Sequence, residues 1–399
     1  MRILSVTAQK PDSTGSGVYL TELVRGFRRL GQEQAVLCGV GPEDTPALPE
    51  RVSCFCVRYE TPGLPFPVPG MSDQMPYRST RYSDMTQEMS VQMRAAFLEK
   101  LMEAAEIFRP DVILCHHLYF TTALVREACP ETRVFAVCHG SDLRQIRKNP
   151  WQRAFIEGQI RKLDGVFALH EQQGETIREL FGIPEARVRI IGTGYNREIF
   201  RRMAGERKAD GKTRLVFAGK IAEKKGVFSL LRALSLLPDP ERWELILAGG
   251  AGDEEEYRRI RAAAEQAPCA LSFPGKLSQR ELAETMNGCD VFVLPSFYEG
   301  LPLVLIEAMA CGLRCVCTDL PGIRPWLESQ LPGNGVVFVP PPAMRNQDEP
   351  LPESLPAFEQ ALARGIERAR LQKQMEPERL EALSWDGLCA RLLPLLEGG

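Results

Sequence analysis

The 399-residue sequence lacks several features that mark common protein classes. It has no window close to the roughly 18 consecutive apolar residues of a membrane-spanning helix. It also has no excess of one charge, because Lys+Arg 49 against Asp+Glu 52 gives a net charge of -3, which does not indicate a nucleic-acid partner. The first apolar run ends before Lys10 and Pro11, which is too short for a signal peptide. We therefore expect a cytoplasmic protein, at most peripheral at the inner membrane.

The twelve cysteines do not form the pattern of a disulfide framework or a standard zinc site. There is no C-x-x-C. Two C-x-C pairs occur, Cys54/Cys56 and Cys315/Cys317, and on a strand each pair would place both thiols on one face. Because no further Cys or His accompanies either pair in the sequence, we expect reduced, buried cysteines that pack as small apolar residues.

What the sequence does contain is a repeated alternation of strand and helix patterns. It is 44% hydrophobic and 25% charged, as globular proteins are, and its length suits two domains of about 100–200 residues each. Apolar strand-like runs occur at 2–8, 34–40, 111–117, 133–140, 165–170 and 188–194, and again at 214–220, 244–250, 271–276, 291–296, 314–319 and 335–340. Uniformly apolar strands alternating with helices predict parallel sheets covered on both faces. The fold class is therefore α/β with two doubly wound, Rossmann-like domains, and the ligand is expected at the carboxyl ends of the strands.

The domain boundaries follow from a polar stretch and a terminal helical pattern. Residues 201–213 read as a linker, so we predict an N-terminal domain of 1–205 and a C-terminal domain of 206–375. Residues 376–399 have helix periodicity and are predicted as a C-terminal crossover helix, which can return to the N-terminal domain.

One Pro-rich stretch, 41–89, fits no strand–helix unit. A long connection without regular elements is often functional, so it is a candidate lid over an acceptor, with Arg78 and Arg81 as candidate acceptor contacts. A solvated surface loop is the alternative.

The turn Gly15-Ser16-Gly17 follows the first strand and opens a helix, where backbone N–H groups can approach an anion. A plain strand-to-helix turn has the same sequence pattern. The turn is not G-x-G-x-x-G, and no acidic residue ends the second strand, which disfavours a nicotinamide dehydrogenase.

In the second half, Lys220 follows Gly219 at a strand end and Lys225 comes shortly after. Two cations there can neutralise a diphosphate leaving group without a metal, although a solvated lysine-rich turn is the alternative.

The segment SFYEGLPLVLIEAMACG places Glu299 before an apolar helix that begins near Leu303. Glu299 can accept hydrogen bonds from sugar hydroxyls, and the N–H groups of Leu303 and Val304 can take a phosphate. Glu307 lies one turn into this helix, where a ribose diol would be a suitable partner.

The order of the Gly-rich turn, HGSDL, GKIAEKKG and EGLPLVLIEAMACG resembles that of the family 4 glycosyltransferases, which are retaining nucleotide-sugar transferases of the GT-B fold. The resemblance covers nearly the whole chain, including IIGTGYNREIF before the linker. It implies two domains that face a central cleft, a nucleotide-sugar as co-substrate rather than a cofactor, and attack on the leaving-group face with the departing phosphate as base.

Carried over position by position, the resemblance implies a set of site residues. His139, Glu299 and Lys225 would act in catalysis, with His139 facing the donor sugar. The residues implied in donor binding are Gly15, Ser16, Gly17, Gly219, Lys220, Lys225, Lys276, Leu277, Glu299, Gly300, Leu301, Leu303, Val304 and Glu307. Within this set, Lys276 and Leu277 lie near the base and Glu307 holds the ribose. Without the resemblance, His139 reads as a core histidine, and His116, His117 and His170 are predicted to be structural.

The sequence departs from the family pattern at two places. Lys220 stands where the family usually has Arg, so it supplies charge but not a planar fork. The usual Asn-Gly-Val-Asp reads Thr193-Gly194-Tyr195-Asn196, which makes Tyr195 a candidate acceptor contact. No D-x-D pair occurs, so no metal site is predicted.

The donor and the acceptor stay open at this point. UDP-GlcNAc and UDP-glucose are the family defaults, and the acceptor is a small molecule, lipid or glycan that Arg78 and Arg81 suggest is anionic. A basic helix face with Arg25, Arg28 and Arg29 allows a membrane contact, although a solvated face is the simpler reading. A nucleotide-sugar 2-epimerase and a non-catalytic partner subunit are the alternative functions.

Overall fold

The structure is a computed structural model of the chain, and it describes residues 1–73, 75–203, 210–346 and 349–398. The described residues form two compact units. The first unit comprises Met1–Thr193 together with Trp385–Gly399, and the second comprises Gly194–Ser384. The division predicted between 205 and 206 lies outside the described residues.

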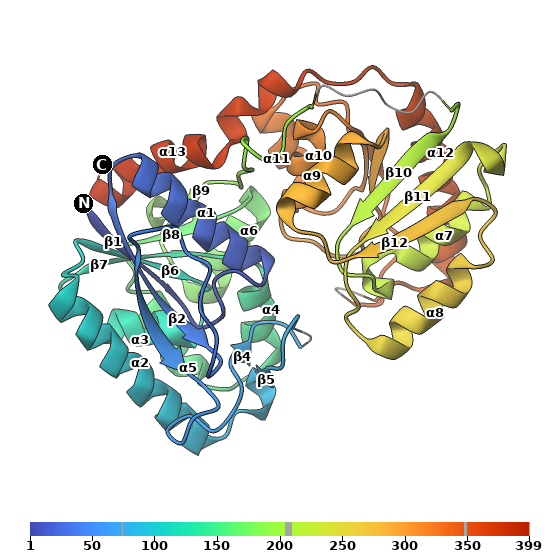
Figure 1. Cartoon of the computed structure of the whole chain (residues 1–399). Coiled ribbons are helices and arrows are strands. Elements are labelled where there is room, and N and C mark those ends of the chain that lie inside the picture. Colours follow the sequence, from blue (N-terminus) through green and yellow to red (C-terminus); the bar gives the residue numbers. More distant parts are fainter. Residues whose placement is uncertain (74, 204–209, 347–348, 399) are drawn as a thin grey trace. The chain divides into compact units, whose positions relative to one another are not determined.

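The first unit is built on a sheet of parallel strands in the order β3-β2-β1-β6-β7-β8-β9 (Figure 1). These strands are β1 (Arg2–Thr7), β2 (Glu33–Val40), β3 (Ser53–Arg58), β6 (Val112–His116), β7 (Arg133–Val137), β8 (Gly165–Ala168) and β9 (Val188–Ile190). The helices are α1 (Gly15–Arg29), α2 (Gln87–Ile107), α3 (Phe120–Ala128), α4 (Ser141–Lys148), α5 (Arg153–Ile160), α6 (Glu171–Phe181) and α13 (Trp385–Glu397). Strands such as β6 and β8 are buried at every position because both faces of the sheet are covered.

The second unit repeats the plan with the strand order β12-β11-β10-β13-β14-β15, again parallel throughout. Its strands are β10 (Thr213–Ala218), β11 (Trp243–Ala248), β12 (Ala270–Gly275), β13 (Val291–Leu294), β14 (Arg314–Thr318) and β15 (Val337–Val339). Its helices are α7 (Val227–Leu234), α8 (Glu254–Ala264), α9 (Gln279–Asn287), α10 (Leu303–Ala310), α11 (Ile323–Gln330) and α12 (Leu355–Leu371). Each predicted strand of both halves is therefore present, and the prediction of two doubly wound sheets is confirmed.

The structure of the Pro-rich stretch differs from the prediction made from the sequence. Residues 41–89 were expected to lack regular elements, but Ser53–Arg58 forms β3, which pairs with β2 at the sheet edge. The pair β4 (Pro69–Gly70) and β5 (Thr80–Arg81) follows. β3 is a strand because it alternates: Phe55 and Val57 are buried in the core, while Cys54, Cys56 and Arg58 lie on the other face. Because many prolines follow this short alternation, the whole stretch was interpreted as an irregular connection and the strand was not predicted.

The end of the chain returns to the first unit, as the sequence suggested. Figure 1 draws α13 alongside α1, and the two helices pack closely enough that a Cβ on Gly26 would lie 2.4 Å from Cys389 Sγ. Arg29 forms an ion pair with Asp386 at 3.2 Å. The predicted helix over 376–399 is not continuous, because a 3-10 helix, Pro377–Leu383, precedes Ser384 and belongs to the second unit.

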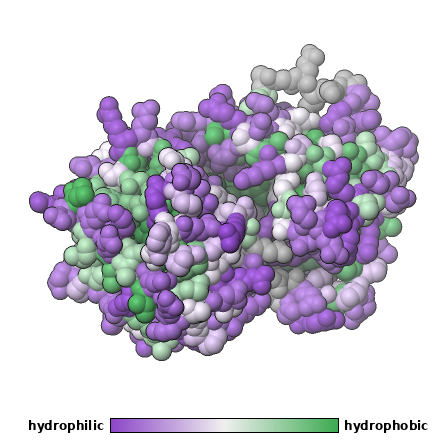
Figure 2. All heavy atoms as spheres, turned by 60° about the horizontal axis from the view of Figure 1, so that its bottom comes forward, coloured by the Kyte–Doolittle hydropathy of each residue, from purple (hydrophilic) through white to green (hydrophobic). Residues whose placement is uncertain are grey.

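The surface drawn in Figure 2 is mostly hydrophilic, with hydrophobic residues in small groups between the polar ones. Within the described ranges, no helix combines the length and the apolar character that crossing a membrane requires.

Candidate active site

Both sheets contain a switch point, the place where ligands bind in doubly wound folds. In the first unit, β2 pairs with one edge of β1, and β3 pairs with β2. The next strand of this sheet along the chain, β6, pairs with the other edge of β1. In the second unit the same reversal separates β10 from β13. In doubly wound folds the loops that leave the carboxyl ends of such a strand pair run in opposite directions, and ligands bind between them. We call these places the first-unit and second-unit switch points.

An ion pair connects the two loops of the second-unit switch point. Lys225 follows β10, and its Nζ lies 2.7 Å from Oε1 of Glu299, which follows β13. The same oxygen accepts a hydrogen bond from Ser296 Oγ at 2.7 Å. The side chains of Lys225 and Glu299 keep 24% and 16% exposure, so solvent or a ligand can reach them. A cation and a hydrogen-bond acceptor are thus held together at the edge of the sheet.

A close approach of backbones makes this pairing possible. Gly226 has φ 70, and a Cβ there would lie 2.0 Å from the carbonyl oxygen of Pro295. Only glycine tolerates both the left-handed conformation and this contact. Gly226 is also the N-cap of α7, so Lys225 lies directly before the cap of that helix.

The helix α10 begins beside Glu299 and presents its amino end. Its N-cap is Pro302, which makes no side-chain cap hydrogen bond, so that residue does not cap the first amides, those of Leu303 and Val304. Such an end carries about half a positive charge. Glu307 is 8% exposed, one turn further along a helix whose other residues are apolar. The preceding Gly300 and Leu301 form the turn between Glu299 and the helix.

A second lysine adds positive charge after β10. Lys220 follows Gly219 directly and is half-buried. Burial, then the charges of Lys224 and Lys225, lower the pKa of Lys220 below its usual value. The repulsion among these ammonium groups would be relieved by a bound anion.

Lys276 and Leu277 lie further away in the sheet. They follow β12, the edge strand, and precede α9, which Ser278 and Glu281 cap reciprocally. Because β11 separates β12 from β10, and neighbouring strands are about 4.8 Å apart, their loop starts about 10 Å from the end of β10. Lys276 is exposed and Leu277 is half-buried.

The first-unit switch point is built around the start of α1. Thr14 caps the helix by accepting a hydrogen bond from the Gly17 N–H at 3.1 Å, and its hydroxyl lies 3.0 Å from that of Ser16. A Cβ on Gly17 would lie 2.8 Å from the carbonyl carbon of Pro11, whereas Gly15 has open space around it. The glycine at 17 therefore lets the helix start against the loop after β1.

Two histidines predicted to be structural belong to this switch point. His117 Nε2 lies 3.1 Å from Ser16 Oγ, which links the loops after β6 and β1. His116 Nδ1 lies 3.0 Å from Nε2 of His139, which follows β7. The sequence prediction singled out only His139. The signal for the other two is their place at the carboxyl end of a strand next to the sheet reversal.

Asp142 of the HGSDL segment connects the loops that carry these histidines. It is completely buried and accepts hydrogen bonds from the N–H groups of Leu118 at 2.8 Å and His139 at 3.3 Å. It therefore ties the loop after β6 to the loop after β7.

All three histidines are held neutral. Burial lowers the pKa of His116 to about 3 and the pKa of His139 well below its usual value, and neighbouring imidazoles add to both effects. Burial also lowers the pKa of His117, and Asp142 opposes this. The three histidines and Ser16 thus offer neutral imidazole and hydroxyl groups at the first-unit switch point.

Comparisons with known proteins match both units. A model of "Glycosyltransferase Family 4" matches residues 13–199, and one of "Glycosyl transferases group 1" matches residues 182–349, so that together they span both switch points. The chain is a family 4 glycosyltransferase.

Individual relatives are distant. Glycogen synthase of Mycobacterium tuberculosis is 25% identical over 342 residues, covering 81% of this chain and 79% of its own length. The D-inositol 3-phosphate glycosyltransferase of Streptosporangium roseum is 24% identical over 342 residues, with 78% and 74% covered. The solved structure of Anabaena HepE in complex with UDP-glucose has a TM-score of 0.67 at 13% identity, with 100% of both chains covered. This likeness confirms the GT-B fold.

The residues predicted for the acceptor of this glycosyltransferase differ in their exposure. Arg78 is 80% exposed on its side chain and pairs with Glu60 at 2.8 Å, and Arg81 is exposed on β5. Tyr195 is 4% exposed, and its N–H donates to the carbonyl oxygen of Leu383 at 3.3 Å. Their contact with an acceptor stays a prediction.

Two of the three arginines on the basic face of α1 form ion pairs within the first unit of the glycosyltransferase. Arg25 pairs with Glu22 on the same helix, and Arg29 pairs with Asp386 of α13. These pairs favour the reading of a solvated, internally neutralised face.

Proposed function

We propose that this family 4 glycosyltransferase transfers a sugar, with retention at the anomeric carbon, from a nucleotide-diphosphate donor to an anionic acceptor. The observation that carries the proposal is the Lys225–Glu299 pair beside the start of α10, whose N-cap Pro302 makes no side-chain hydrogen bond. UDP-glucose and UDP-GlcNAc are the proposed donors. The UDP-glucose complex of HepE, a protein of the same fold, supports this choice.

The diphosphate is proposed to bind at the second-unit switch point without a metal ion. Lys220 and Lys225 supply two positive charges, and the start of α10 adds about half a charge more. This approximates the negative charge that develops on a departing nucleoside diphosphate. When the anion engages Lys225, Glu299 is released from its 2.7 Å ion pair and can accept hydrogen bonds from the donor sugar.

The remaining donor contacts follow the sheet. The loop with Lys276 and Leu277, about 10 Å from the end of β10, suits the nucleoside base, and Glu307 suits the ribose diol. In the first unit, neutral His139 suits a hydrogen bond to a sugar hydroxyl. The departing phosphate is proposed as the base, as the resemblance to the family implies.

The acceptor is proposed to carry negative charge. Arg78 and Arg81 are the cationic candidates, on the segment after β3. A relative named D-inositol 3-phosphate glycosyltransferase supports a phosphorylated acceptor.

The test is donor turnover in EDTA, with the product anomer determined by NMR. Activity should persist under chelation, and Glu307→Ala should raise the donor KM, while Glu328→Ala, at an exposed position on α11, should not. Loss of activity on chelation, or an inverted product, contradicts the proposal. Isomerised donor without any acceptor would indicate an epimerase, and donor-dependent thermal stabilisation without turnover would indicate a binding subunit.

A further inference from the structure

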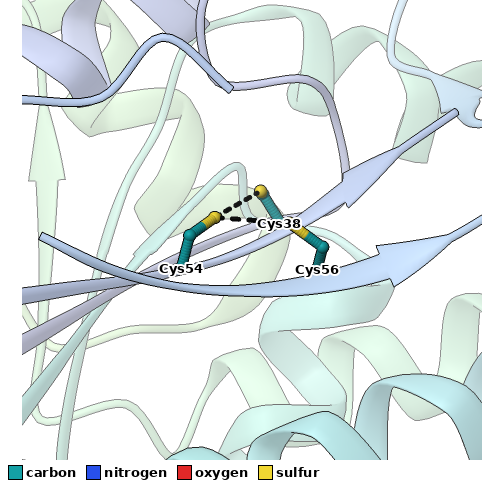
Figure 3. Close-up of side chains that lie close together, drawn as sticks. All are labelled: Cys38, Cys54 and Cys56. Carbon is teal, nitrogen blue, oxygen red and sulfur yellow. Dashed lines mark hydrogen bonds between the residues drawn. The ribbon is translucent and has the colours of Figure 1, made fainter. Parts of the chain in front are cut away.

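Three cysteine thiols meet at the edge of the first-unit sheet, on the strands β2 and β3. Cys38 lies on β2, and Cys54 and Cys56 lie on β3 (Figure 3). The Sγ atoms of Cys38 and Cys54 are 3.8 Å apart, and those of Cys54 and Cys56 are 3.4 Å apart. All three sulfur atoms lie within 4.8 Å of one another.

The strand register explains this meeting. Cys56 is the direct partner of Cys38 across the β2–β3 ladder. Cys54 and Cys56 are two residues apart, so their side chains leave the same face of β3, as Figure 3 shows. The sequence analysis found no third ligand for the Cys54/Cys56 pair, and that expectation is corrected: Cys38 supplies it from the neighbouring strand.

The surroundings differ on the two sides of the cluster. Cys38 is fully buried and packs in a small apolar cluster that includes Leu20, Val24 and Val40. Cys54 is exposed. The expectation that every cysteine is buried is therefore wrong for Cys54. An apolar floor with one exposed thiol gives a rigid site that a ligand can enter from solvent.

We propose that Cys38, Cys54 and Cys56 bind a thiophilic divalent cation, zinc, through three thiolates, with a fourth position open to water. Zn–S bonds of about 2.3 Å at tetrahedral angles place sulfur atoms about 3.8 Å apart, which is close to the separations found here. Within the part of the chain that the structure describes, no further Cys, His, Asp or Glu joins this group, which leaves the fourth position to solvent.

Zinc binding forms the three S–Zn bonds and releases the protons that the thiols carry, so it needs no oxidant or reductant.

A bound ion would join β2 to the edge strand β3. The segment that follows β3 carries Arg78 and Arg81, so the ion would stabilise the base of that segment without touching either switch point. Zinc should therefore raise the thermal stability of the first unit and leave the donor KM unchanged.

The experiment is a zinc titration of the full chain, stripped of metal and kept reduced, against a chromophoric chelator. We expect one equivalent of zinc with submicromolar affinity, and Co²⁺ should give a thiolate-to-metal charge-transfer band. Cys54→Ser and Cys56→Ser should each weaken zinc binding by about 100-fold. Cys269→Ser, at a half-buried cysteine of the second unit, is the matched control and should change nothing.

A second measurement needs no variant and so does not depend on variant folding. Zinc should slow the alkylation of exposed Cys54 in the wild-type chain and leave that of Cys269 unchanged. Zinc binding that survives both serine substitutions, or the absence of the cobalt band, overturns the proposal. A loss of two hydrogen masses mapped to this cluster, without metal uptake, overturns it in favour of a disulfide.

Discussion

The two switch points have the same topology but opposite chemistry. At the first-unit switch point, His117 and Ser16 join the loops through a contact between neutral groups at 3.1 Å. At the second, Lys225 and Glu299 join them through an ion pair at 2.7 Å. In both, a glycine allows the close approach of backbone that brings the side chains together.

This difference indicates a division of labour. Charge is concentrated where a diphosphate would be held, because full charges give the strongest interaction with a polyanion. Neutral imidazoles and hydroxyls offer directional hydrogen bonds without attracting a second anion. A duplicated fold can therefore supply a charged site and a neutral polar site from the same place in each sheet.

The largest expected effect is on kcat/KM, and it differs between the two switch points. Lys225→Ala should lower kcat/KM by about 100- to 1,000-fold, because it removes a charge aimed at the leaving group. Ser16→Ala should cost only about tenfold, because a neutral hydrogen bond is lost. Steady-state kinetics on both variants tests this, with Lys224→Ala as a control for charge alone. Equal losses in all three variants would remove the proposed distinction.

A second prediction concerns stability and compares the two glycines. Gly226→Ala combines a left-handed residue with a 2.0 Å approach to Pro295, so it should destabilise the second unit by about 3 kcal/mol. Gly17→Ala, with its 2.8 Å approach to Pro11, should cost about 1–2 kcal/mol in the first unit. Chemical denaturation monitored by hydrogen exchange measures each unit. Gly15→Ala, where space is open, serves as the control and should not destabilise. A milder effect at Gly226 than at Gly17 would contradict the geometry.

A third prediction uses pH, because all four histidines lie in the first unit. Burial lowers the pKa of each of them in the folded state, to about 3 for His116 and about 4 for His170. The unfolded chain therefore takes up protons first, so stability is full above about pH 6.5 and falls as the pH is lowered toward the folded pKa values.

Between pH 6.5 and 5, His116 alone should cost the first unit about 2 kcal/mol. Hydrogen exchange at the two pH values should show the loss in the first unit, and His116→Gln should reduce it. An equal loss in the second unit would mean that other groups dominate.

The smallest effect concerns Lys220, whose pKa burial and neighbouring lysines lower. A bound diphosphate favours the protonated amine, so donor affinity should be full below the pKa of Lys220 and weaken as the pH rises through it. The donor KM should rise by up to about tenfold per pH unit, beginning below pH 10.5. Lys220→Arg should keep KM flat over this range, since arginine stays charged. An identical rise in the variant would assign it to another group.

Much of the fold was predictable because buried parallel strands are uniformly apolar and easily recognised. β3 was missed because a half-buried edge strand shows only a short alternation, and only Phe55 and Val57 face the core. Lys225 and Glu299, which the structure joins in an ion pair, could be singled out from the sequence because each lies in a contiguous motif, and their roles stay predictions. The contacts of His117 and Cys38 were not predicted because their partners, Ser16 on α1 and Cys54 on β3, lie on other elements, and such long-range pairing is not visible in local spacing.

The return of α13 onto α1 has a consequence for synthesis on the ribosome. The first unit is discontinuous, since Trp385–Gly399 completes it only after the whole second unit has been made. The second unit can fold as soon as Ser384 has left the ribosome. Tyr19 of the first unit can make its aromatic contact only after Trp385 has been synthesised; the centroids of the two rings lie 4.8 Å apart. Nascent chains should therefore protect the later-made unit before the earlier one is finished, the reverse of vectorial order.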